Sequence, residues 1–273
     1  MASPRNHADP AEGEDRRNQV RTIFTEIAPR YDLLNHVLSL NVDRRWRRRA
    51  VHRLREGLVA HADASSRCCG KLRPRAKDAD SGSASGSDSA PGPRLLDCCA
   101  GTCDLSLDLL RIGAGVRVVS ADFALPMLVA GVRKTADRPV FLTCADALEL
   151  PFPDDSFSGA AIAFGLRNLA DVVAGLRELR RVLRPSGRLV ILEFTTPPNP
   201  AVRAGYHFYF KRVLPLVGRV VSGHPWAYTY LPRSVGAFPG PEPLADELRM
   251  AGYGDVDYEL LSAGIAALHW GSA

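Results

Sequence analysis

The sequence predicts an α/β fold built on a doubly wound, mostly parallel sheet of seven strands. From residue 94 onward, short apolar runs that are typical of buried strands alternate with longer stretches of helical periodicity. Such alternation is typical of parallel strands joined by crossover helices. Of the 273 residues, 46% are hydrophobic, so the chain can bury the core of one large domain, whereas two complete domains would be cramped.

The predicted elements of the core follow one another in a regular order. We expect strands at residues 95–98, 116–121, 140–143, 159–164 and 188–194, and helices at residues 105–112, 125–136, 172–183 and 243–251. A turn is expected at residues 185–187. Two closing strands, at residues 256–261 and 265–269, fit an antiparallel hairpin across Ser262, Ala263 and Gly264.

The composition divides the chain into four segments. Residues 1–16 are polar and are expected to form a disordered tail, and residues 17–61 are expected to form a helical cap. Residues 62–93 contain the run SGSASGSDSAPGP, which is typical of a flexible linker, so we expect a disordered insertion there. Residues 94–273 form the core, with an aromatic and basic acceptor-side insert at about residues 199–240.

The cap is expected to contain three helices. The first has an apolar stripe at helical spacing that Pro29 interrupts, the second begins near Leu33, and the third is rich in arginine. The net charge is +5, and five arginines surround Trp46 within residues 44–49. This pattern fits a solvated helix face, and it also fits a peripheral contact with an anionic membrane surface. No nucleic-acid-binding module accompanies it, so nucleic acid is not expected as a partner.

The cysteines indicate a reducing compartment. The six cysteines include two adjacent pairs, which suit a disulfide framework poorly, and the N-terminus lacks the apolar stretch of a signal peptide. We therefore expect a cytoplasmic protein. Because the spacing of Cys98, Cys99 and Cys103 does not match that of zinc ligands, no metal is expected.

The segment RLLDCCAGTCD, at residues 94–104, predicts a ligand site. An apolar run ends in Asp97, small residues surround Gly101, and a helical pattern follows. In doubly wound folds this loop lies at the carboxyl end of a parallel strand, where nucleotides bind. It contains neither GxGxxG nor a P-loop signature. An acid at the strand end instead suits a ligand with a cationic amine and a ribose, such as S-adenosylmethionine.

Acids after the next two strands complete the predicted donor site. Asp122 ends the second strand, about 20 residues beyond the first loop, where an acid can accept the ribose hydroxyls; the alternative is a helix N-cap. Asp146 follows the third strand and is expected to accept the adenine amino group beside the backbone amide of Ala147. The alternative for Asp146 is a local Asx turn.

The remaining candidates surround the expected methionine end and the mouth of the cleft. Gly101 and Thr102 are expected where the backbone approaches the donor. Asp97 is one of the acids nearest the expected ammonium group, unless it only supports the helix start. Arg167 and Asn168 are expected at the mouth of the cleft, where Arg167 could orient or stabilise an anionic, enolate-like substrate. The alternative for Arg167 is a salt bridge at a helix start.

Together these motifs resemble the UbiE/MenG family of quinone C-methyltransferases, class I enzymes that use S-adenosylmethionine. The resemblance runs from about Val20 to the C-terminus, apart from the linker. Beyond the glycine loop it rests on the stretches VRTIFTEIAPRYDLLNHVLSL, FGLRNLAD, LEFTTPPNP, YLPRSVGAFPGPEPLADELRMAGY and GIAALHWG. Thr102 matches the donor-binding threonine of this family. Cys103 replaces a smaller residue, and we expect it to need a φ below zero and to intrude on the methionine end of the donor.

The resemblance implies methyl transfer to a ring carbon of a polyprenylated quinol, catalysed largely by positioning. It implies that Tyr31 and Asp32 close over the donor. Candidates for a base are Asp32, His207, His224 and a water held by Arg167, with none preferred.

The acceptor implied by LDCCAGT and FYFKRVLPLVG is demethylmenaquinol, which places the chain in menaquinone biosynthesis. The alternatives are the ubiquinone precursor 2-polyprenyl-6-methoxy-1,4-benzoquinol and a methyltransferase with another acceptor. A non-catalytic membrane- or RNA-binding module is disfavoured, because a pure binder has no need of the acids of the donor site. A homodimer is compatible with the sequence.

Overall fold

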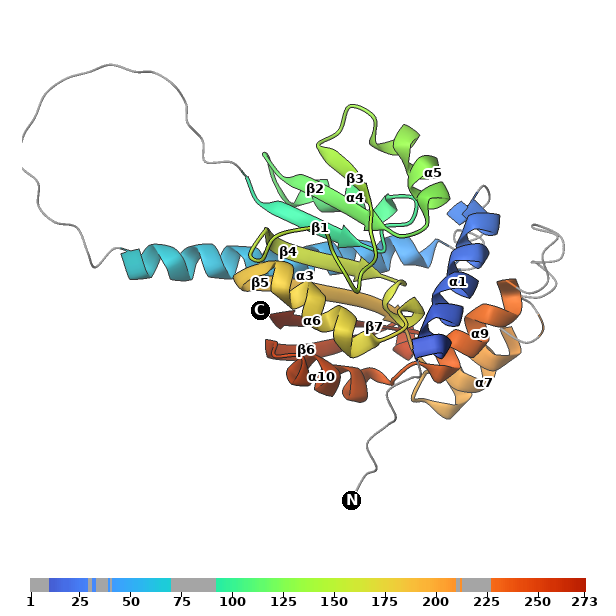
Figure 1. Cartoon of the computed structure of the whole chain (residues 1–273). Coiled ribbons are helices and arrows are strands. Elements are labelled where there is room, and N and C mark those ends of the chain that lie inside the picture. The colour runs from blue at the N-terminus through green and yellow to red at the C-terminus, as the bar shows by residue number, and fades with distance from the viewer. Residues whose placement is uncertain are drawn as a thin grey trace, which may run out of the picture.

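The computed structural model describes residues 10–28, 31, 32, 39, 41–69, 92–209, 212 and 227–273. Its seven-stranded sheet has the order β3-β2-β1-β4-β5-β7-β6 (Figure 1). The strands are β1 (Arg94–Cys98), β2 (Arg117–Asp122), β3 (Val140–Cys144), β4 (Phe157–Ala163), β5 (Leu183–Phe194), β6 (Gly254–Leu261) and β7 (Ala266–Ser272). The first five pair in parallel, and β7 is antiparallel to both β5 and β6. The predicted fold class and the closing hairpin are confirmed.

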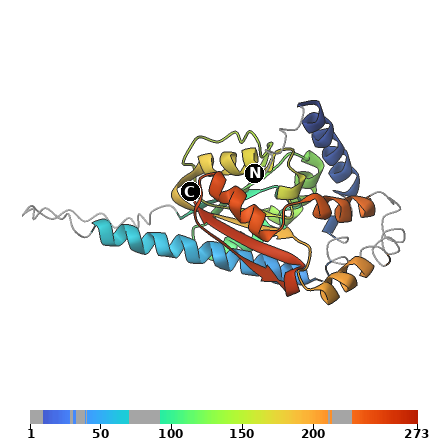
Figure 2. The same ribbon diagram turned by 90° about the horizontal axis from the view of Figure 1, so that it is seen from below.

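Helices cover both faces of this sheet. They are α1 (Pro10–Ile27), α3 (Val42–Cys69), α4 (Asp104–Leu109), α5 (Leu125–Thr135), α6 (Val172–Val182), α7 (Pro200–Phe208), α9 (Ala227–Ala237) and α10 (Pro241–Met250), with short 3-10 turns η2 (Leu110–Ile112), η3 (Leu166–Asn168) and η5 (Ser262–Gly264). Figure 2 shows α3 along one face and α6 with α10 on the other. Each face buries its own apolar cluster, centred on Leu54 and Leu95 beneath α3 and on Phe157 and Leu176 beneath α6.

The boundaries differ from the prediction at a few places. Helix α1 begins at Pro10, inside the segment predicted as a disordered tail, and α3 continues to Cys69, past the predicted end of the cap. Strand β5 begins at Leu183, and its pairing with β4 skips residues 184–187, where a turn was predicted. The predicted helix near Leu33 lies outside the described residues. In the described part of the chain, no helix has the length and apolar character needed to cross a bilayer.

In the arginine-rich helix α3, Trp46 faces the core and most of the surrounding arginines face solvent. Trp46 is buried, and its indole nitrogen donates to the Ser262 hydroxyl at 3.0 Å. The Arg47 guanidinium pairs with Asp43, Asp104 and Asp108. The helical period could not reveal this burial, because the residues that contact Trp46 are Phe164, Phe194 and Ser262, all more than 100 positions later in the chain.

Candidate functional site

Two adjoining cavities lie at the carboxyl ends of the central strands. The larger, of about 450 Å³ including space open to solvent, is lined in part by Cys99, Asp122, Asp146 and Asn168. The smaller, of about 350 Å³, shares Cys99, Asp122 and Asn168 and adds Tyr31 among its walls. The residues shared by both cavities come from the loops after β1, β2 and β4, so three strand ends converge on one site, as doubly wound folds favour.

Asp122 joins the first two of these loops. Its carboxylate accepts the amide of Gly101 at 2.8 Å with one oxygen and the amide of Ala124 at 2.8 Å with the other. Gly101 has φ +54°, a left-handed conformation that glycine adopts without a steric penalty. Burial raises the pKa of the Asp122 carboxyl above its ordinary value. Each carboxylate oxygen keeps acceptor capacity toward the cavities, which is what a pair of ribose hydroxyls requires.

Asp146 forms the local turn that was the alternative role, and it also lines the larger cavity. One of its oxygens accepts the amide of Leu148 at 2.9 Å, which is the local turn, while its side chain also lines the larger cavity. The other oxygen forms an ion pair with Arg17 of α1. Ala147, which follows it, lines the same cavity and is buried.

Asp97 lies behind the site instead of in it. Its side chain is 1% exposed, accepts a hydrogen bond from the Ser106 hydroxyl, and lines neither cavity. Burial raises the pKa of this carboxyl to about 7. Its predicted contact with the donor's ammonium group stays a prediction, and in this structure its carboxylate binds the Ser106 hydroxyl at the start of α4.

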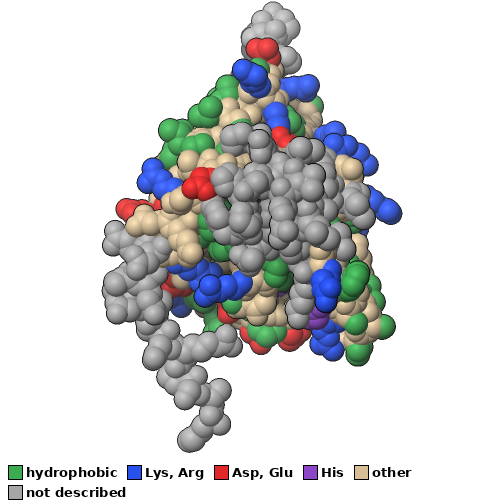
Figure 3. Space-filling view, turned by 90° about the vertical axis from the view of Figure 1, so that its right-hand side faces the viewer, with side chains coloured by type: hydrophobic (Ala, Val, Ile, Leu, Met, Phe, Trp, Pro, Cys, Tyr) green, Lys and Arg blue, Asp and Glu red, His purple; other side chains and the backbone are tan. Residues whose placement is uncertain are grey.

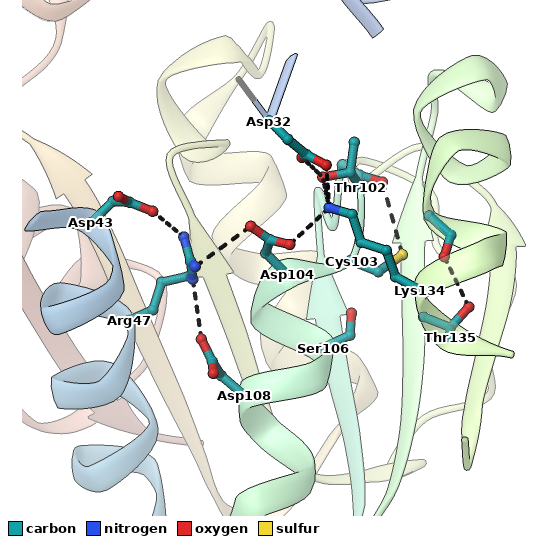
Figure 4. Close-up of polar contacts among 12 residues, drawn as sticks. Asp32, Asp43, Arg47, Thr102, Cys103, Asp104, Ser106, Asp108, Lys134 and Thr135 are labelled. Atoms are coloured by element: carbon teal, nitrogen blue, oxygen red, sulfur yellow. Dashed lines mark hydrogen bonds and ion pairs between the residues drawn. The ribbon is translucent and has the colours of Figure 1, made fainter. Parts of the chain in front are cut away.

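The side chain of Thr102 faces the cap and lines neither cavity, and its predicted contact with the donor stays a prediction. Its hydroxyl donates to Asp32 at 2.5 Å and accepts from Lys134 at 3.0 Å (Figure 4). Lys134 also pairs with Asp104 and with Asp32, both within 2.8 Å. This network ties the cap to α4 and α5, so Asp32 is held beside the donor loop by charge.

Cys103 differs from both sequence expectations. It adopts φ +68°, not a negative φ, and its fully buried sulfur points toward Gly131 of α5 instead of toward the cavities. An added Cβ at Gly131 would stand 2.7 Å from that sulfur. Burial raises the pKa of the Cys103 thiol to about 12, so this cysteine is a packing residue.

Arg167 forms the salt bridge that the sequence left as its alternative role. Its guanidinium contacts Glu193 of β5 at 2.7 Å, is nearly buried, and lines neither cavity. Asn168, the next residue, does reach both cavities, and its side-chain oxygen accepts from the Tyr230 hydroxyl at 2.9 Å. Of the two residues expected at the mouth of the cleft, only Asn168 is among the residues that line these two cavities.

The remaining candidates fall in different places. Tyr31 lines the smaller cavity, and its expected position over the donor stays a prediction. His207 is exposed on α7 and lines neither cavity, and His224 lies outside the described residues. Arg17 and Glu193 were not among the predicted site residues. Glu193 lies near the end of an apolar strand, as Asp97 does, so the presence of an acid at a strand end could have indicated it. No local pattern distinguishes Arg17 from its neighbouring arginines.

Comparisons with known proteins indicate the family to which the chain belongs. Residues 12–72 and 79–273 match the model of the ubiE/COQ5 methyltransferase family. A demethylmenaquinone methyltransferase of Thermus thermophilus is 47% identical over 252 residues, 91% of this chain and 99% of that protein. One of Deinococcus radiodurans is 41% identical over 257 residues, 93% of this chain and 92% of that protein.

A solved structure supports the fold alone. The CurJ carbon methyltransferase superposes with a TM-score of 0.51 at 19% identity, covering 68% of this chain and 49% of that one. The family model spans nearly the whole chain, interrupted only between residues 72 and 79. This chain belongs to the ubiE/COQ5 methyltransferase family.

Proposed function

We propose that this chain transfers a methyl group from S-adenosylmethionine to a ring carbon of demethylmenaquinol, which yields menaquinol. The names of relatives up to 47% identical support the acceptor, and the carboxylate of Asp122, facing both cavities, supports the donor. When bound, the donor supplies the electrophilic methyl carbon. The acceptor ring carbon becomes nucleophilic as a quinol hydroxyl loses its proton.

The residues at the site fit a donor with a ribose and an adenine. Asp122 would accept the ribose hydroxyls, and Asp146 would accept the adenine amino group, since each carboxylate retains unused lone pairs beside the cavity. Gly101 leaves the wall of the smaller cavity without a side chain at the point nearest Tyr31. Tyr31 and Asp32 would then close the cap over this end.

The protein's own contribution to the reaction is mainly positional. Asn168 would orient the acceptor, because it reaches both cavities and is itself fixed by Tyr230. Arg167 acts as a positioning residue, since its pairing with Glu193 holds the η3 turn that carries Asn168. Asp32 is a weak candidate for the base, because Lys134 and Thr102 already bind its carboxylate.

A polyprenylated acceptor resides in a bilayer, so peripheral membrane contact in the cytoplasm is part of the proposal. The surface that favours such contact is α5, where Leu125, Val129 and Val132 form an apolar stripe, each at least 50% exposed. Arg133 and Arg138 lie beside it, and the helix has no acidic residue, so its charge suits anionic lipid headgroups. In Figure 3, hydrophobic and basic side chains are intermixed toward the upper end of the molecule, where Figure 1 places α5.

Quinone profiling of a deletion strain tests the acceptor. We expect demethylmenaquinone to accumulate, and the wild-type gene but not Asp122→Ala to restore menaquinone. Accumulation of a ubiquinone precursor without its ring methyl would instead support the alternative acceptor. Calorimetry with S-adenosylmethionine tests the donor separately: wild-type protein that binds none of it contradicts the proposal.

A further inference from the structure

Helix α1 lies across the donor cavity and touches two different strand-end loops. Figure 1 shows α1 spanning the carboxyl edge of the sheet between α5 and α9. Arg16 donates from its guanidinium to the backbone carbonyl of Arg167 at 2.8 Å, on the loop after β4. The next residue, Arg17, forms its ion pair with Asp146, on the loop after β3, and lines the larger cavity. Two consecutive arginines thus hold one helix to both sides of the site.

The C-terminal half of α1 is held by apolar contacts. Val20 and Ile23 are buried, and Phe24 lines the smaller cavity. Phe24 also packs with Tyr31, Ala28 and Met127 in a small apolar cluster between α1 and α5. One end of the helix is therefore held by apolar contacts and the other by charge. The charged end is the weaker, since the Arg17 and Asp146 side chains are 45% and 27% exposed.

We propose that α1 is a strap over the donor cavity and that Arg17 is its latch, a positioning residue that controls uptake of the donor and release of its demethylated product. This inference rests on the proposed use of S-adenosylmethionine at this site. Asp146 can accept an adenine amino group while it remains paired with Arg17, because a carboxylate has about four acceptor positions and only two are used. The latch is thus compatible with both the empty and the filled site. It must open for exchange.

This geometry makes a kinetic prediction that differs from that of an ordinary binding residue. A latch that closes over the empty cavity and over the filled cavity slows both association and dissociation of the ligand. The ratio of the two rate constants, which is the dissociation constant, then stays nearly unchanged. A residue that holds the donor directly slows dissociation alone. Because the latch is an ion pair, salt should accelerate exchange in the wild-type protein.

The test measures the association and dissociation rate constants of S-adenosylhomocysteine by surface plasmon resonance on the full chain. The variants are Arg17→Gln and the double variant Arg16→Gln/Arg17→Gln. The matched control is Arg21→Gln, since Arg21 is exposed on the same helix and the structure gives it no ion pair among the described residues. Circular dichroism verifies that each variant is folded.

We expect both rate constants to rise about threefold in Arg17→Gln and up to about tenfold in the double variant, with a dissociation constant within twofold of wild type. The control should match wild type. Raising the salt concentration should accelerate exchange in the wild type and not in the double variant. The proposal is overturned if both rate constants of the double variant equal those of the wild type. It is also overturned if the dissociation rate constant rises while the association rate constant stays the same. If the wild-type chain binds no S-adenosylhomocysteine or S-adenosylmethionine, the proposed function itself fails, which is a separate outcome.

Discussion

Arg167 and Glu193 form a buried ion pair, with 2.7 Å between the guanidinium nitrogen and the carboxylate oxygen. Glu193 also accepts the backbone amides of Arg167 at 3.3 Å and of Phe194 at 2.8 Å. The pair therefore joins the turn after β4 to the end of β5. Through this turn it fixes the position of Asn168 at the cavities.

Breaking this pair from one side should destabilise the protein strongly. Removing one partner of a buried pair leaves an uncompensated charge, which typically costs about 3–5 kcal/mol. We expect Glu193→Gln to lower the free energy of unfolding by roughly 3 kcal/mol in urea denaturation. Arg167→Met in the same protein should recover part of that loss, because no charge is then left unpaired. A double variant less stable than Glu193→Gln alone would contradict this account.

Asp97 should make stability decline as pH rises through the neutral range. Its pKa is about 7 in the folded chain and about 4 in the unfolded chain, so between these values the folded state binds more protons. The contribution of Asp97 to stability is then largest below about pH 4 and falls until about pH 7. Relative to wild type, Asp97→Asn should gain about 2–3 kcal/mol between pH 5 and pH 8, measured by urea unfolding. If the free energy of unfolding depended on pH in the same way in both proteins, Asp97 would not titrate in this range.

Gly131 and Cys103 should be coupled through their contact. Gly131→Ala gains about 1 kcal/mol of helix propensity. However, its Cβ would stand 2.7 Å from the Cys103 sulfur and 3.2 Å from the Thr102 backbone, and overpacking costs about 1–3 kcal/mol. We expect a net loss of about 1 kcal/mol, which Cys103→Gly partly reverses because it removes the sulfur and suits the positive φ. Strictly additive effects in a double-mutant cycle would show that the sulfur is not the obstacle.

The apolar stripe of α5 should contribute to binding of anionic vesicles. Val129→Ser/Val132→Ser should weaken co-sedimentation with phosphatidylglycerol vesicles at least about threefold, since each valine loses apolar area that the bilayer would cover. Met250→Ser is the control, because Met250 is 65% exposed on α10, at the opposite end of the sheet order. If the wild type, the double valine variant and Met250→Ser bound the vesicles equally, the membrane contact would lie outside the stripe of α5.

Local patterns in the sequence were sufficient for the elements of the sheet and for part of the site. Strand and helix periods are set by each residue's immediate neighbours, so the alternation after residue 94 predicted the parallel sheet and the closing hairpin. Acids at the ends of successive parallel strands meet at one edge, which is why Asp122 and Asp146 were predicted to lie together and do line one cavity.

Side-chain direction and distant partners were decided only by the tertiary structure. The left-handed backbone at Cys103 turns its sulfur toward Gly131, and the cap draws Thr102 to Asp32. Arg167 is buried against Glu193, which lies 26 residues later in the chain, near the end of the neighbouring strand β5. These contacts join segments far apart in the chain, and no local period records which of them will meet. The sequence by itself determined which elements form and which acids share an edge, whereas packing between elements decided which of those residues face the cavities.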